Sequence, residues 1–205
     1  MIETHTFGIF SLNNQHASLP KYETVYAACF DLVFCNPSDK NTVDAYDMFN
    51  HKNVSTIIRG GLTLYPGHRV LVPTALIFDL RQDVEPSFWS SKIGMNSPNT
   101  GDLFFMKVYP RSGLSFKTGL GLINSVGIID SDYVGQLMIP MVNHSEKEVV
   151  LNVGDRIAQA EILKNGMSIR SKFVWRSTPP EEFGGRTGGF GSTGGFTTTP
   201  SPKPV

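Results

Sequence analysis

Apolar residues in this chain come mostly in short runs rich in Val, Ile, Leu and Phe, separated by Gly, Pro, Asn and Asp. Runs of this kind, bounded by turn residues, are typical of β-strands rather than helices. The pattern predicts strands over residues 24–34, 69–80, 103–109, 119–129, 135–143, 147–152, 156–163 and 169–175. Residues 112–118 are expected to form one short helical turn.

Turn sequences separate these predicted strands. Tyr-Pro-Gly-His at 65–68, Asn-Ser-Val-Gly at 124–127 and Asn-Val-Gly-Asp at 152–155 are each compatible with a tight reversal. Many short strands with turn chemistry between them indicate an all-β domain of the double-sheet or jelly-roll kind.

Three parts of the chain depart from this rhythm. Residues 36–61 are polar and mixed, and residues 82–102 carry prolines and several Ser and Asn residues around an apolar trio. Both are expected to be long connections laid over the core of a domain that covers residues 1–178. The Gly-rich segment 179–195 and the Thr/Pro tail 196–205 have, on composition alone, the character of a flexible linker.

Length, charge and cysteine content narrow the range of possible functions. With 205 residues the chain is long enough for one domain with a sizeable core. The 18 basic and 18 acidic residues balance, so net charge favours neither nucleic acid nor an anionic membrane as a partner, and local groups must hold any anionic ligand. Cys29 and Cys35 form no Cys-x-x-Cys pair, which argues against a structural zinc site and a disulfide framework. No apolar run reaches the roughly 18 residues of a membrane span, and a cytoplasmic location is expected.

Residues 110–115, Pro-Arg-Ser-Gly-Leu-Ser, follow a predicted strand and open the predicted helical turn. Their backbone N–H groups, the Ser112 hydroxyl and the Arg111 guanidinium can converge on one anion, as at helix N-termini that bind phosphate. A capped turn with a surface arginine explains the same residues equally well.

Acidic residues also interrupt or end apolar runs. Asp130 and Asp132 follow an apolar pair, and a carboxylate at the rim of a hydrophobic strand can act as a general base for water. Asp31 lies inside an apolar stretch, where it either hydrogen-bonds at a strand edge or helps to hold a hydrated Mg²⁺. Taken singly these signals also fit ordinary loops, and residues 154–159 alone indicate only a β-turn and a strand.

All five signals occur in one chain in one order, and that ordered set resembles the five motifs of the trimeric dUTPase family. The motifs are matched by residues 28–32, 110–114, 124–135, 154–159 and 186–194. Their joint occurrence is far more specific than any one motif, and the match covers most of the chain apart from the two connections and the tail.

The resemblance implies a distorted jelly-roll subunit of the β-clip type with one short helix, assembled as a homotrimer whose active sites are shared between subunits. It implies hydrolysis of dUTP to dUMP and pyrophosphate with the help of Mg²⁺. It also replaces the linker interpretation of 179–195 with that of a mobile arm that closes over a site built by other subunits.

The resemblance assigns Asp130 as the base that activates the attacking water and Asp31 as the residue that steadies hydrated Mg²⁺. Tyr133 is expected to lie under the deoxyribose and to exclude a 2′-hydroxyl. The other implied substrate-binding residues are Arg111, Ser112 and Gly113 for the phosphates, Gln159 near the α-phosphate, Asn124, Ile128, Ile129 and Met138 for the uracil, and Arg186, Phe190, Gly191, Ser192 and Thr193 of the arm.

Some positions depart from the family pattern, and other functions stay open. Cys29 and Phe30 stand where the family usually has Gly and Tyr, and Val134 replaces a commonly polar residue. A dCTP deaminase of the same superfamily is less favoured, because the second motif and the Gly-rich arm have the dUTPase form. A regulatory protein could use the same body to contact a partner through 36–61 or 82–102, and that role would not exclude catalysis.

Overall fold

A computed structural model describes residues 4–12, 17–37, 41–80, 104–164, 167–175, 177 and 187. The strands are β1 (Thr4–Ser11), β2 (Phe30–Val33), β3 (Thr42–Tyr46), β4 (Lys52–Ile58), β5 (Gly61–Leu64), β6 (Arg69–Pro73), β7 (Leu76–Asp79), β8 (Phe104–Pro110), β9 (Leu120–Leu122), β10 (Gly127–Ile129), β11 (Met138–Asn143), β12 (Val149–Asn152), β13 (Arg156–Lys164) and β14 (Met167–Trp175), and the helix is α2 (Ser112–Thr118).

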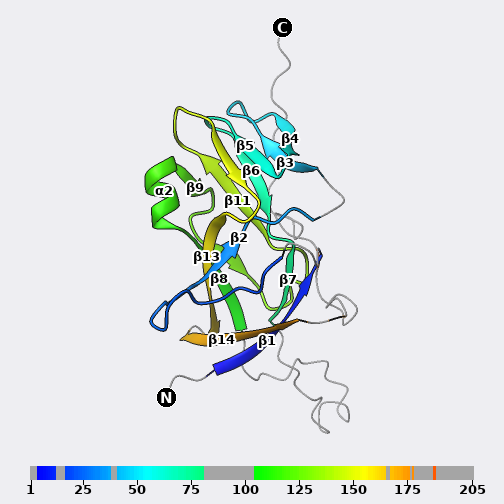
Figure 1. Cartoon of the computed structure of the whole chain (residues 1–205), viewed down its shortest axis with the longest axis vertical. Coiled ribbons are helices and arrows are strands. Elements are labelled where there is room, and N and C mark those ends of the chain that lie inside the picture. The colour runs from blue at the N-terminus through cyan, green and yellow to red at the C-terminus, as the bar shows by residue number, and fades with distance from the viewer. Residues whose placement is uncertain are drawn as a thin grey trace.

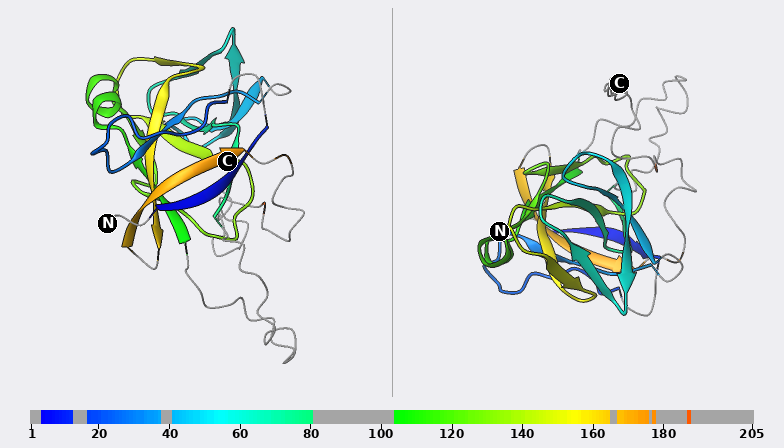
Figure 2. Two further views of the ribbon diagram at one scale, coloured as in Figure 1. Left: turned by 60° about the horizontal axis from the view of Figure 1, so that its bottom comes forward. Right: turned by 90° about the horizontal axis from the view of Figure 1, so that it is seen from above.

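The strands form two sheets (Figure 1). The first sheet has the order β10-β8-β13-β14-β1-β7, with β2 also paired to β13, and the second has the order β12-β5-β4-β3-β6-β11-β9. Seen from above, strands of both sheets surround a common interior (Figure 2). Within the described residues, the prediction of an all-β jelly-roll fold with one short helix is confirmed.

The core lies between the sheets because strands of both alternate buried and accessible side chains. β3 buries Val43 and Ala45 between exposed neighbours, and β8 buries Phe104, Met106 and Val108. Successive side chains of a strand point to opposite faces, so this alternation turns one face of each strand inward. Complete burial of one large apolar side chain stabilises the fold by roughly 1.5–3 kcal/mol.

The prediction that residues 36–61 form a connection over the core is wrong for most of that stretch. β3 and β4 run through it, β5 begins at Gly61, and both β3 and β4 are interior strands of the second sheet. The alternation of Val43 and Ala45 with polar neighbours is the signal that reveals β3. The other predicted connection, 82–102, lies outside the described residues.

Several predicted strand boundaries also differ from the structure. β1 was not predicted, and only Phe30–Val33 of the range 24–34 is a strand. The predicted strands 69–80 and 119–129 each break in two, at Ala75 and Ser125, whose φ angles are 57° and 59°. A left-handed residue cannot continue an extended strand. Each break transfers the chain from the second sheet to the first.

The helix α2 occupies the predicted residues 112–118. It ends at Gly119, which has φ 76° and donates its N–H to the Ser115 carbonyl oxygen over 2.9 Å. A Cβ at Gly119 would stand 2.9 Å from the Ser145 Cβ, so both conformation and space require glycine there. No residue of α2 is buried, and Ser112 and Gly113 at its beginning are exposed. Within the described residues, no helix has the length and apolar character that crossing a membrane requires.

Candidate active site

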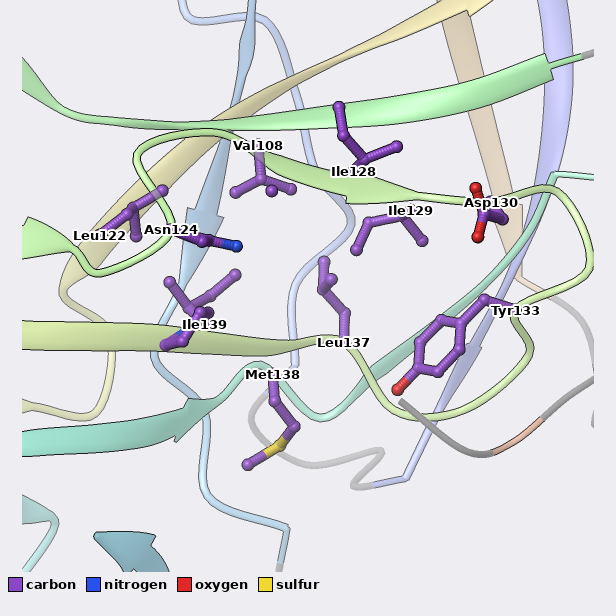
Figure 3. Close-up of a pocket in the computed structure, with 12 residues that line it drawn as sticks. Val108, Leu122, Asn124, Ile128, Ile129, Asp130, Tyr133, Leu137, Met138 and Ile139 are labelled. Carbon is purple, nitrogen blue, oxygen red and sulfur yellow. The ribbon is translucent and has the colours of Figure 1, made fainter. Parts of the chain in front are cut away.

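A cavity of about 200 Å³ opens between the edges of the two sheets (Figure 3). Its walls come from β8, β9, β10 and β11 and from the turns that flank β10. The lining residues are Val108, Leu122, Asn124, Gly127, Ile128, Ile129, Asp130, Tyr133, Leu137, Met138, Ile139 and Pro140. Sites for drug-sized ligands measure roughly 300–1,000 Å³, so this smaller cavity suits one ring system rather than a whole nucleotide.

The structure brings together the residues that the sequence singled out in the third motif and Met138, which follows it. Asn124, Ile128, Ile129, Asp130, Tyr133 and Met138 all line this one cavity. The sequence reasoning missed the apolar walls, which come from Val108, Leu122, Leu137, Ile139 and Pro140. Their apolar character favours burial, but only tertiary packing places them beside β10.

The strand β10 lies at the edge of the first sheet, and one side of its backbone faces the cavity. β8 lies on one side of β10, with Gly127 opposite Val108, and the cavity lies on the other (Figure 3). An edge strand has N–H and C=O groups that are not used within the sheet. The backbone of β10 can therefore hydrogen-bond to the edge of a planar ligand.

Asp130 and Tyr133 lie at the end of β10 (Figure 3). The Tyr133 N–H donates to the Asp130 carbonyl oxygen over 3.2 Å, and the Tyr133 hydroxyl donates to the Gln136 carbonyl oxygen over 2.7 Å. These bonds hold the ring against the wall, while Asp130 is exposed. A carboxylate at the mouth of a cavity can accept a proton from a water that attacks the bound ligand.

A second group of charged residues lies around β2. Because β2 buries Phe30 and Leu32, it turns Asp31 to the opposite face. There Asp31 Oδ1 accepts a hydrogen bond from Arg111 Nε over 2.8 Å, and Oδ2 accepts one from Arg156 over 3.1 Å. Arg111 also donates to the Arg156 carbonyl oxygen over 3.2 Å. Asp31 thus holds two guanidinium groups on one face.

This arginine cluster continues to the first turn of α2. Ser112 and Gly113 are exposed, with open space around Gly113. The Gln159 side-chain amide donates to the Pro110 carbonyl oxygen over 3.0 Å and so fixes the approach to the helix. Guanidinium groups beside spare backbone donors are typical of phosphate-binding sites. The predicted phosphate-binding residues are therefore neighbours.

Two further members of the cluster were not singled out from the sequence. Arg156 begins β13, and Glu23 Oε2 lies 3.6 Å from its guanidinium. The position of Arg156 at the beginning of a strand after a tight turn is a signal in the sequence. Glu23 has no such signal, because only folding places it beside Arg156.

Tyr109 and Cys29 stay protonated behind this cluster. Burial raises the pKa of Tyr109 to about 12, with a further contribution from the Glu161 carboxylate, which accepts a 2.6 Å hydrogen bond from the phenol. Burial, together with the Glu161 and Asp31 carboxylates, raises the pKa of the Cys29 thiol. A protonated thiol is a poor nucleophile and a poor metal ligand, so Cys29 is a candidate for neither role.

The residues present fit a hydrated Mg²⁺ rather than a metal bound directly by the protein. In the described part of the chain, no group of three or more His, Cys, Asp or Glu residues is placed to hold a metal ion. Direct ligation by Asp31 would displace an arginine, but its carboxylate oxygens have further lone pairs that can accept hydrogen bonds from metal-bound waters.

In a single chain, the cavity and the arginine cluster lie too far apart to surround one phosphate. β8 and β13 lie between β10 and β2, which corresponds to three strand spacings, or roughly 14 Å. By the strand register, Asp31 is level with Tyr109, and Asp130 with Phe105, which adds an offset of roughly 13 Å along the strands.

The predicted arm lies almost wholly outside the described residues, and so do Arg186, Phe190, Gly191, Ser192 and Thr193. Thr187 is the exception. Its carbonyl oxygen lies where a Cβ at Gly135 would project, close to Tyr133.

Comparisons with known proteins identify the family of this chain. Residues 106–194 match the family model described as dUTPase. The chain is 32% identical over 183 residues to the deoxyuridine 5′-triphosphate nucleotidohydrolase of Finegoldia magna, covering 89% of this chain and 96% of that protein. It is 33% identical over 192 residues to the enzyme of the same name from Brucella melitensis, covering 92% and 93%. The dUTPase from phage phi11 of S. aureus superposes with a TM-score of 0.52 at 16% identity, covering 78% of this chain and 90% of that one. The chain belongs to the dUTPase family.

Proposed function

We propose that this protein is a homotrimeric dUTP diphosphatase, which hydrolyses dUTP to dUMP and pyrophosphate at sites between subunits. One observation carries the proposal: in a chain of this family, a ring-sized cavity has an edge strand along one wall and the Asp130 carboxylate at its mouth. Base, sugar and triphosphate are each recognised by a separate part of the site.

The uracil ring lies in the cavity beside β10, with Asn124 and Met138 near it. The uracil edge carries one donor between two acceptors, and backbone groups of an edge strand can pair with both kinds. The apolar walls leave no space for the 5-methyl group of thymine, so dTTP is refused. Ile128 and Ile129 supply the backbone that reads the base.

The deoxyribose lies against the ring of Tyr133. A ring held in place by its hydroxyl group leaves no room for a 2′-hydroxyl, and a ribose would also leave that polar group without a partner. UTP is therefore a poor substrate.

The triphosphate lies on the arginine cluster. Arg111, Ser112 and Gly113 supply the donors, and Gln159 lies near the α-phosphate. When bound, Mg²⁺ supplies positive charge to the phosphate oxygens. Asp31 orients Arg111 and Arg156 toward the phosphates and accepts hydrogen bonds from the waters of the metal.

Asp130 is the general base. Its carboxylate accepts a proton from the water that attacks the α-phosphorus, and pyrophosphate leaves on the opposite side. Arg186, Phe190, Gly191, Ser192 and Thr193 belong to the arm that closes over the nucleotide and excludes bulk water.

The separation of Asp130 from Asp31 within one chain supports a site shared between subunits. A nucleotide that occupies the cavity of one chain reaches the arginine cluster of a neighbour when copies pack around a closed symmetry axis. Three such copies give three equivalent sites.

The experiment is to measure pyrophosphate release from dUTP, dCTP, dTTP and UTP in parallel, with Mg²⁺ present. dUTP alone should give rapid release. No release from dUTP contradicts the proposal, and ammonia released from dCTP would favour the deaminase alternative.

A further inference from the structure

Gly135 is buried beneath the ring of Tyr133, in a position where no side chain fits. A Cβ built at Gly135 stands 2.4 Å from the Thr187 carbonyl oxygen, 2.8 Å from the Tyr133 hydroxyl oxygen and 2.9 Å from Tyr133 Cζ. All three distances are shorter than the contacts that real Cβ atoms make. The φ angle of Gly135 lies outside the left-handed region, so an alanine here meets a problem of space and not of backbone conformation.

The ring cannot move aside without losing its anchor. The Tyr133 hydroxyl donates to the Gln136 carbonyl oxygen over 2.7 Å, and the Tyr133 N–H is tied to the Asp130 carbonyl oxygen. Val134, between Tyr133 and Gly135, is completely buried, so the backbone is also held. A methyl group at position 135 therefore pushes the outer part of the ring toward the cavity that Tyr133 lines.

We propose that Gly135 is a positioning residue for substrate selection: its missing side chain sets how far the Tyr133 ring protrudes into the sugar space. This inference rests on the proposed function. Gly135 does not touch the substrate and acts through Tyr133. A protruding ring opposes binding of the sugar in the ground state and the transition state alike, so it raises KM more than it lowers kcat.

The test is a double-mutant cycle of Gly135→Ala and Tyr133→Ala, with KM and kcat measured for dUTP. Gly135→Ala alone should raise KM by about tenfold or more while kcat changes only a few-fold. In the Tyr133→Ala background, the same change should leave KM nearly unaltered, because the clashing ring is gone. Gly121→Ala on β9 is the matched control, since a Cβ there meets His144 at 3.4 Å, an ordinary contact.

Two outcomes would overturn the inference. One is an unchanged KM in Gly135→Ala. The other is an equal effect of Gly135→Ala with and without the Tyr133 ring, which would assign the clash to the Thr187 carbonyl oxygen instead.

Melting temperatures of the same four proteins give a readout that needs no substrate. If Gly135→Ala fails to fold, Tyr133→Ala must restore folding, and a double variant that stays unfolded contradicts the inference. Absence of dUTP turnover by the wild-type protein would refute the proposed function separately.

Discussion

At the scale of single residues, the two aspartates of the candidate site have different surroundings. Asp130 is exposed at the cavity mouth, whereas the Asp31 side chain is 14% exposed and accepts hydrogen bonds from two arginines. A carboxylate that must take a proton needs access to water, and one that holds arginines needs a fixed position. The surroundings therefore match the different roles proposed for them.

Asp130→Asn should bind dUTP and Mg²⁺ with nearly wild-type affinity, yet lose typically 10²–10⁴-fold in turnover, the usual contribution of a general base. Turnover and the dissociation constant of a non-hydrolysable dUTP analogue are the two measurements. Asp132→Asn, an exposed carboxylate two residues away, is the control and should keep most of its activity. Wild-type turnover by Asp130→Asn would show that Asp130 is not the general base.

Asp31→Asn should weaken triphosphate binding and raise the Mg²⁺ concentration needed for half-maximal turnover, because the amide has no charge and only one acceptor oxygen for Arg111 and Arg156. A Mg²⁺ titration of the rate at several dUTP concentrations measures both effects. Glu23→Gln removes a longer, more exposed contact to Arg156 and should have a smaller effect. Equal effects of the two substitutions would contradict the special role of Asp31.

At the scale of elements, the strands β8 and β13 are joined by side chains as well as by their ladder. Tyr109 of β8 donates its 2.6 Å hydrogen bond to Glu161 of β13, and the register places these strands side by side over seven residue pairs. Both the turn after β8, which we propose to bind phosphate, and Gln159 on β13 depend on this pairing. The pairing of β8 with β13 and the hydrogen bond between Tyr109 and Glu161 therefore help to hold the arginine cluster in position.

The raised pKa of Tyr109 predicts a stability change at alkaline pH. Between its unfolded value near 10 and its folded value of about 12, the native state holds a proton that the unfolded state has lost. The contribution of Tyr109 to the free energy of unfolding is therefore fully present below pH 10 and is lost as pH rises toward 12. Urea unfolding at several pH values measures this. The free energy of unfolding should fall more steeply with pH in wild type than in Tyr109→Phe. The control, Tyr26→Phe, changes a residue that is 97% exposed and should follow wild type. Parallel curves for wild type and Tyr109→Phe would contradict the prediction.

At the scale of the whole molecule, β2 and β10 lie apart in one sheet, with β8 and β13 between them. This separation favours an active site that two copies of the chain form together. The cavity belongs to one part of the surface and the arginine cluster to another, with β8 and β13 between them. In the proposed homotrimer, a closed ring of copies would bring the two parts together three times. A protein that is monomeric by light scattering at micromolar concentration would contradict this assembly.

Mixed trimers test the sharing directly. Asp130→Asn and Arg111→Ala should each be nearly inactive alone, since each lacks one half of every site. Refolded together in equal amounts, they should recover on the order of a quarter of the wild-type sites, because that share combines an intact Asp130 with an intact Arg111. Activity of the mixture is compared with the sum of the separate proteins. No gain over that sum would indicate that both residues serve the same chain's site.

The sequence by itself determined the all-β class, the helix at 112–118 and the residues of the cavity's third motif, because these depend on local information. Apolar runs and turn residues specify strands, and Pro110 and Gly119 frame the helix. The motif that contains Asn124, Asp130 and Tyr133 is contiguous, so its residues stay near one another in the fold. The roles of the arm and of residues 82–102 stay predictions.

Only the tertiary structure decided where the chain changes sheets and which charges meet. The breaks at Ala75 and Ser125 arise where left-handed residues end one strand and the next joins the other sheet. The turn sequence at 124–127 is compatible with the second break, but alanine at position 75 is not a turn signal, and no local pattern tells which sheet the next strand joins. β3 was missed because its alternation is short and lies among polar residues. Asp31 meets Arg111 and Arg156, distant in sequence, because β2 and β8 both pair with β13. Such contacts follow from strand order, which depends on the packing of the whole chain and not on any local pattern.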